Sequence, residues 1–140
     1  MLEGLAARIT PFASQNEMVD TQRMYDNFMK KFRFGNIADP NVYVDQTIMR
    51  MCYTHRMRMV QLAAQLAKEG RKKEALEVLN KCEKVFPAQQ VPYDFFSLGF
   101  SPNGRQFLMP QLYHELGRDA DARRILTASL CCPGWSAVAQ

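Results

Sequence analysis

The side chains that most often carry chemistry are sparse in this chain and are not grouped. Its four cysteines and two histidines show no CxxC pair and no spacing that would hold a metal ion. The sequence also lacks a phosphate-binding glycine loop and the HExxH and GxSxG motifs. His114 and Glu115 are adjacent in an expected helix, so they would point about 100° apart and would not form a dyad. We therefore expect no catalytic residue, no cofactor and no metal in this fragment, and no enzyme activity from it alone.

Aromatic side chains crowd one stretch that is also rich in turn-forming residues. Between residues 91 and 100, the candidates for partner-binding anchors are Tyr93, Phe95, Phe96 and Phe100. Aromatic residues concentrate binding energy at protein interfaces, which favours a contact surface here. The alternative is a loop that folds back and packs onto the helices. Asp94, which lies among these aromatics, suits a turn better than an acid catalyst.

The composition is typical of a soluble globular domain. The chain has 140 residues, of which 47% are hydrophobic and 23% are charged, enough for one core. It has no apolar run long enough for a membrane helix and no signal-peptide pattern, so the chain as given is expected to be soluble. The run NFMKKFRF mixes basic and aromatic residues, but a helix that buries Phe28 and Phe32 explains it equally well. With a net charge of only +4, we expect no nucleic-acid partner.

The stretch from Met59 to Pro87 has the pattern of two helices joined by a short turn. It has apolar or small residues where a tetratricopeptide-type repeat places its packing positions, at Leu62, Leu66, Ala75, Leu79, Cys82 and Pro87. Antiparallel helices approach closely where small residues such as Ala63 and Ala75 lie at their crossing. Cys82 occupies such a position, so we expect it to be a buried hydrophobe. One pair cannot bury both of its faces, so the pattern predicts further helices stacked beside it.

Local signals predict where the helices begin and end. We expect helices from Asp20 to a stop at residues 34–36, and then over residues 46–68, 72–85, 105–116 and 119–130. The carboxylates of Asp20 and Asp45 are expected to cap the first two helices. Gly70 and Gly117 are expected to form the turns within the two later pairs. Pro110 is expected to kink its helix or to shift its start.

These elements predict an all-α fold of tetratricopeptide-like antiparallel helix pairs, with an N-terminal helix and an aromatic-rich loop. Residues 1–19 would form a lead-in segment, residues 20–130 the helical domain, and residues 131–140 an atypical tail to which we assign no function. The expected anchors of the lead-in are Leu5, Ile9 and Phe12. Several methionines lie in the helix expected over residues 46–68, namely Met49, Met51, Met57 and Met59. They would fill the core or, alternatively, line an adaptable peptide groove.

Four runs of the sequence resemble one protein family: EGLAARITPF, MYDNFMKKFRFGNIADPNVYVD, QLAAQLAKEGRKKEALEVLNKC and VPYDFFSL. The resemblance is to the C-terminal region of large bacterial membrane proteins, common in Bacteroidetes, that are related to protein O-mannosyltransferases and are mostly of unknown function. It covers about Leu2 to Leu126, and the tail departs from it. It implies a soluble, tetratricopeptide-like region on the periplasmic side of the inner membrane. The membrane portion, where the family's acidic catalytic residues are expected, is not in this sequence, so the resemblance implies no catalytic position here.

The favoured function is therefore a non-catalytic accessory domain of a glycosyltransferase-like membrane protein that contacts a protein or peptide partner. A free-standing cytosolic adaptor of tetratricopeptide type is the first alternative. A carbohydrate-binding module is the second, because of the aromatic stretch and the family context. Self-association through the aromatic stretch also remains open.

Overall fold

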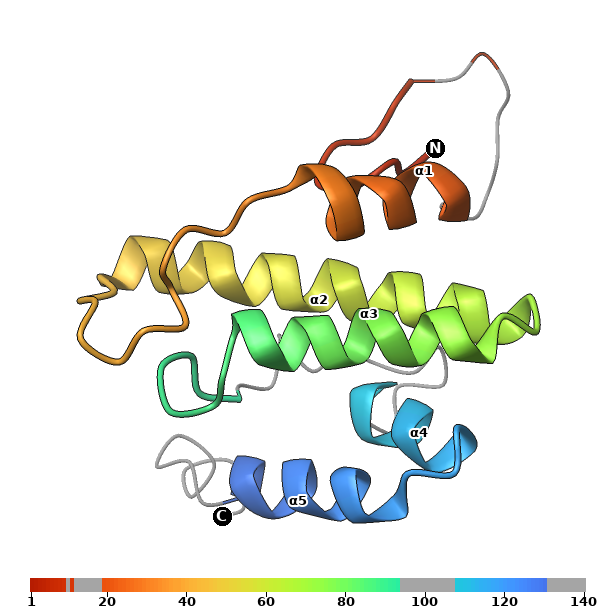
Figure 1. Cartoon of the computed structure of the whole chain (residues 1–140). Coiled ribbons are helices and arrows are strands. Elements are labelled where there is room, and N and C mark those ends of the chain that lie inside the picture. The colour runs from red at the N-terminus through yellow and green to blue at the C-terminus, as the bar shows by residue number, and fades with distance from the viewer. Residues whose placement is uncertain (10, 12–18, 94–107, 131–140) are drawn as a thin grey trace, which may run out of the picture.

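The computed structural model describes residues 1–9, 11, 19–93 and 108–130, and this part of the chain is mainly helical (Figure 1). Its helical elements are α1 (Thr21–Asp26), which continues directly as the π-helical turn η1 (Asn27–Lys31), α2 (Gln46–Lys68), α3 (Lys72–Val85), α4 (Leu108–Glu115) and α5 (Asp119–Leu130). The described residues contain no strand, only isolated bridges that join Leu2 to Ala7 and to Val19. The all-α prediction is confirmed. No helix in the described part of the chain is both long and apolar enough to cross a membrane.

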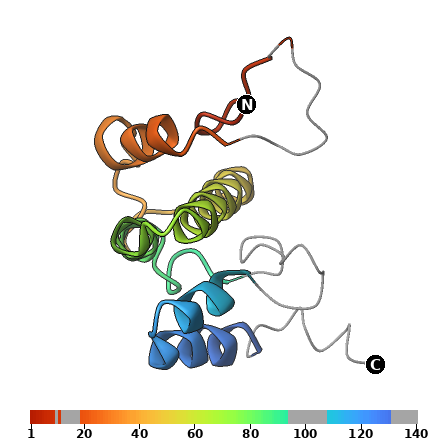
Figure 2. The same ribbon diagram turned by 90° about the vertical axis from the view of Figure 1, so that its right-hand side faces the viewer.

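The helices are stacked in three layers. Figure 2 shows α1 and η1 in the first layer, α2 and α3 side by side in the second, and α4 and α5 in the third. Because short turns reverse the chain between α2 and α3 and between α4 and α5, the two helices of each pair run antiparallel (Figure 1). The middle pair is covered on both sides, which is what a helix pair with two apolar faces requires.

Two turns of the same geometry close the helix pairs. After α2, Gly70 has a φ of +81°, the Arg71 amide donates to the Leu66 carbonyl, and the Gly70 amide donates to the Ala67 carbonyl. After α4, Gly117 has a φ of +78°. The Arg118 amide donates to the Tyr113 carbonyl, and the Gly117 amide donates to the His114 carbonyl. This is the Schellman arrangement, in which a left-handed glycine satisfies the last carbonyls of a helix. The prediction of turns at both glycines is confirmed.

The N-terminal caps also follow the prediction. The Asp20 carboxylate accepts a hydrogen bond from the Arg23 amide at 3.0 Å, and the Asp45 carboxylate accepts one from the Ile48 amide at 2.7 Å. Each carboxylate satisfies an amide of the opening turn that has no partner within the helix. These caps explain why α1 and α2 begin at Thr21 and Gln46.

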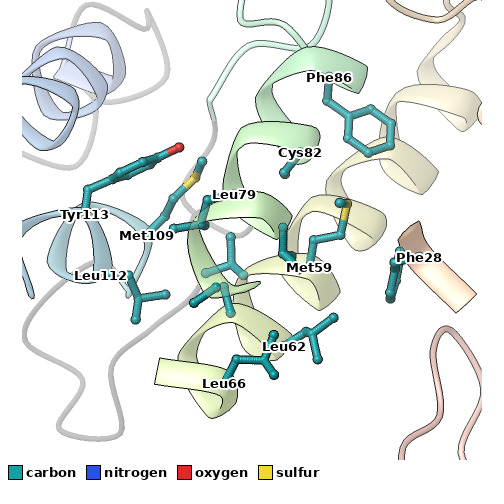
Figure 3. Close-up of a cluster of buried hydrophobic side chains, with 14 of the residues drawn as sticks. Phe28, Met59, Leu62, Leu66, Leu79, Cys82, Phe86, Met109, Leu112 and Tyr113 are labelled. Atoms are coloured by element: carbon teal, nitrogen blue, oxygen red, sulfur yellow. The ribbon is translucent and has the colours of Figure 1, made fainter. Parts of the chain in front are cut away.

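The core runs through all three layers. In Figure 3, side chains of α2 (Met59, Leu62, Leu66) lie beside those of α3 (Leu79, Cys82), with Phe28 of η1 on one side and Met109, Leu112 and Tyr113 of α4 on the other. All of them are buried. Ala63 and Ala75 are fully buried in the middle pair, in line with their expected role as small packing residues, and Cys82 is a buried hydrophobe as predicted.

Two local expectations need correction. The first helix ends at Lys31, earlier than the predicted stop at residues 34–36, because Phe32 is extended with a ψ of 134° and Gly35 serves the following turn instead. In the lead-in, the predicted anchors are wrong: Ile9 is 97% exposed and Leu5 is also exposed, whereas Leu2 is buried. The third predicted anchor, Phe12, lies outside the described residues. Pro110 lies in the first turn of α4, where a missing amide hydrogen costs no helical hydrogen bond.

Candidate functional site

An open groove lies between the first layer and α3. It has a volume of about 630 Å³ and is lined by Met29, Phe34, Gly35, Ala38, Glu77, Asn80, Lys81, Lys84 and Val85. Residues 29–38 form one wall and one face of α3 forms the other. The apolar lining comes from both walls, whereas the charged lining comes from α3 alone. The groove therefore combines an apolar surface with charges on one side.

Two hydrogen bonds join the first layer to α3 at the groove. The Tyr25 hydroxyl donates to the Glu77 carboxylate at 2.6 Å, and the Lys81 ammonium donates to the Met29 carbonyl at 2.9 Å. The hydrogen bond to Glu77 raises the pKa of Tyr25 to about 12, so the hydroxyl keeps its proton near neutral pH. These contacts join segments that are far apart in sequence, so the groove is a product of the tertiary structure.

Phe34 fixes the end of the groove that is nearest the start of α2. Its ring meets Phe86 edge-on with centroids 5.5 Å apart, and meets His55 edge-on at 5.9 Å. Edge-to-face geometry brings the positive ring edge to the negative ring face and adds to simple burial. Phe34 also lines a smaller hollow of about 170 Å³ next to Ile48 and Met51 of α2. Phe34 therefore lines both the groove and this hollow, which are adjacent.

Arg56 of α2 is buried and binds residues 86–93, the segment that follows α3, by a set of contacts that we call the clasp. It is 1% exposed, and its guanidinium donates to the carbonyls of Phe86 and Pro92 at 2.9 Å and of Val91 at 2.5 Å. The same group lies over the Tyr93 ring, 4.9 Å from its centre, as a cation–π contact. The sequence gave no sign of these contacts with three carbonyls.

Of the four predicted aromatic anchors, Tyr93 lies in the described part of the chain. Tyr93 is 3% exposed and belongs to the core, as does Val91, so the start of the aromatic stretch takes the packing role that the sequence left open beside the anchor role. The other anchor candidates, Phe95, Phe96 and Phe100, lie outside the described residues, as does Asp94. In the described part of the chain, the most exposed aromatic side chain is instead Tyr43, at 86%.

A polar cluster joins α3, α4 and α5. The Glu83 carboxylate accepts a hydrogen bond from the Tyr113 hydroxyl at 2.9 Å and from the Arg124 guanidinium at 2.5 Å. Burial and the charge of Glu83 raise the pKa of Tyr113, so its hydroxyl stays protonated and donates. The hydrogen bond to Glu83 likewise raises the pKa of Arg124. Each of these three side chains has a hydrogen-bond partner within the cluster, so the cluster links α3, α4 and α5.

The histidines and methionines take separate places. The His114 ring lies 2.5 Å from the Asp119 carboxylate across the turn between α4 and α5, and the His55 ring lies against the Met51 carbonyl at 2.6 Å. Within the described residues, no three histidine, cysteine or acidic side chains are grouped closely enough to hold a metal ion. Met59 is in the core and Met51 is exposed, so the methionines of α2 do not share one role.

Comparison with known proteins adds no relative. No protein-family model, no curated protein and no solved structure matches the chain.

Proposed function

We propose that this chain is a non-catalytic binding module, built of tetratricopeptide-like helix pairs, that holds a segment of another protein in the groove between residues 29–38 and α3. The observation that carries the proposal is the groove itself, with apolar lining on both walls and a volume of about 630 Å³. Stacked helix pairs suit this role because they offer an extended surface that needs little rearrangement on binding.

Two features support helix pairs of tetratricopeptide type. The turns at Gly70 and Gly117 have the same hydrogen-bond pattern, and each is followed by a buried alanine, Ala75 and Ala122. Small residues at equivalent positions of successive pairs are characteristic of such repeats. The sequence resemblance adds the proposed setting: a soluble region on the periplasmic side of the membrane, within a larger glycosyltransferase-like protein.

The binding role is tested by selecting peptides from a random display library on the purified chain. The groove-blocking variant is Asn80→Trp, because Asn80 is exposed on α3 and lines the groove. The matched control is Lys73→Trp, which places the same side chain at an exposed position of the same helix away from the groove lining. We expect the selected peptides to bind at least about tenfold more weakly to Asn80→Trp and with unchanged affinity to Lys73→Trp.

Two results would contradict this role. One is a library that yields no peptide whose fluorescence anisotropy distinguishes the two variants. The other is a glycan array on which the chain binds sugars while it binds no peptide. The proposed setting is tested separately by the coding sequence upstream of this chain: many membrane spans would support it, and an isolated soluble reading frame would refute it.

A further inference from the structure

We infer that the groove takes an extended peptide segment in which apolar side chains alternate with carboxylates. This inference rests on the proposed binding function and adds the chemistry of the partner. It is carried by the charges at the groove, whose described lining includes two lysines and one glutamate.

The acidic side chains in the described ranges are all engaged. Each of them accepts a hydrogen bond from a described side chain or backbone amide, in caps, ion pairs or bonds to neutral donors. On the groove, the one acidic residue among the described lining residues is Glu77, and it already accepts from the Tyr25 hydroxyl. A hydrogen bond from a neutral donor leaves a carboxylate charged, so Glu77 keeps one negative charge at the groove, against the two positive charges of Lys81 and Lys84.

The basic side chains at the groove are not engaged in this way. Lys84 is exposed and forms no ion pair with a described residue, and the Lys81 ammonium donates to the Met29 carbonyl without an ion pair to a described residue. Lys31 and Arg33 are exposed and form no ion pair with a described residue, but they are not among the lining residues of the groove, and Arg33 lines the neighbouring hollow instead. Because its described lining carries two positive charges and one negative charge, the groove attracts a negatively charged segment and disfavours a positive one.

The lining of the groove favours a peptide over a nucleic acid. Met29, Ala38 and Val85 are apolar contributions from both walls, which suit the side chains of a peptide. Single-stranded nucleic acid prefers aromatic faces on which bases stack. The one aromatic side chain of the described lining is Phe34, and it is half-buried by its contacts with Phe86 and His55. A peptide in which leucine alternates with glutamate can place its leucines against the apolar walls and its glutamates beside Lys81 and Lys84.

The test compares three fluorescent peptides of equal length, in which leucine alternates with glutamate, glutamine or lysine, together with a single-stranded oligonucleotide. The charge variant is Lys84→Glu, and its matched control is Lys72→Glu, an exposed lysine on α3 that does not line the groove. We expect the glutamate peptide to bind most tightly, with its affinity falling when salt is added. Lys84→Glu should weaken it about fivefold or more, with no change for the glutamine peptide or for Lys72→Glu.

The outcomes separate the two proposals. If the three peptides bind equally well and Asn80→Trp abolishes all three, the groove binds peptides and the charge inference is overturned. If none of the three peptides binds although the library yields peptides that Asn80→Trp weakens, the inference is overturned; if the library selection fails as well, the proposed function itself fails. If the oligonucleotide binds more tightly than the glutamate peptide, the groove serves nucleic acid and the inference is overturned. Stronger binding of the lysine peptide to Lys84→Glu than to the unaltered chain would support it.

Discussion

The guanidinium carbon of Arg56 lies 4.9 Å from the centre of the Tyr93 ring, while the same group donates hydrogen bonds to three backbone carbonyls of residues 86–92. A buried cation thus organises the segment that leaves α3. Because backbone carbonyls without a donor are costly in the interior, Arg56 and this segment depend on each other. The clasp also places Phe86, whose ring supports Phe34 at the groove.

The first prediction concerns this clasp. Arg56→Met should lower the free energy of unfolding by about 3 kcal/mol or more, because several carbonyls lose their donor at once. Arg56→Lys should recover only part of the loss, since an ammonium lacks the planar fork of the guanidinium. Urea denaturation measures both variants. Arg50→Met, at an exposed position of the same helix, is the control and should be nearly neutral; a comparable loss for Arg50→Met would refute the special role of Arg56.

The second prediction concerns the link between α3 and α5. Arg124→Ala should cost about 1 kcal/mol, because it removes the ion pair with Glu83. The value is small since the Arg124 side chain is 49% exposed and water screens the pair. The neighbouring Arg123 is exposed and forms no ion pair with a described residue, so Arg123→Ala should leave stability unchanged. Equal effects of the two substitutions in thermal unfolding would show that the pair contributes nothing specific.

The third prediction concerns the glycine turns. Gly70→Ala and Gly117→Ala should each destabilise the protein by about 1 kcal/mol, because both glycines have left-handed backbone angles. An added Cβ would meet no described atom within 4 Å at either position, so the cost comes from the backbone and not from a clash. Gly70→Asn should cost less, since asparagine tolerates this conformation better. Denaturant midpoints for the three variants check the order, and an alanine variant as stable as the unaltered chain would exclude strain at that turn.

The fourth prediction concerns pH. Burial raises the pKa of Cys82 from 9.0 to about 12, so the folded protein holds a thiol proton that the unfolded chain releases. Stability from this group is complete below about pH 9 and is lost as the pH rises from there toward 12. We expect the free energy of unfolding to fall between pH 8 and pH 10.5, as measured by urea denaturation. Cys82→Ala should be less stable at pH 8 but should show a smaller decline, and an identical decline would assign the effect to other groups.

Helix bounds could be predicted from the sequence because their signals are local. The predicted helices over residues 46–68, 72–85 and 119–130 match α2, α3 and α5. An aspartate cap, a left-handed glycine and a small residue act within one or two helical turns, so neighbouring residues suffice to read them. The first helix was predicted too long because Gly35 looked like its stop, whereas the chain already becomes extended at Phe32.

The groove and the clasp could not be predicted in this way. They depend on residues 29–38 meeting α3, and on residues 86–93 meeting Arg56, and these contacts join segments that are distant in sequence. The burial of Tyr93 could not be predicted either. An aromatic residue that follows a proline suits a contact surface as well as a core, and the sequence does not distinguish the two.

By itself the sequence determined where most of the helices lie, the caps at Asp20 and Asp45 and the two glycine turns, since these are properties of short segments. Only the tertiary structure decided which apolar and charged side chains share a surface. That choice depends on how the layers pack, and packing brings together side chains whose spacing along the chain carries no common period.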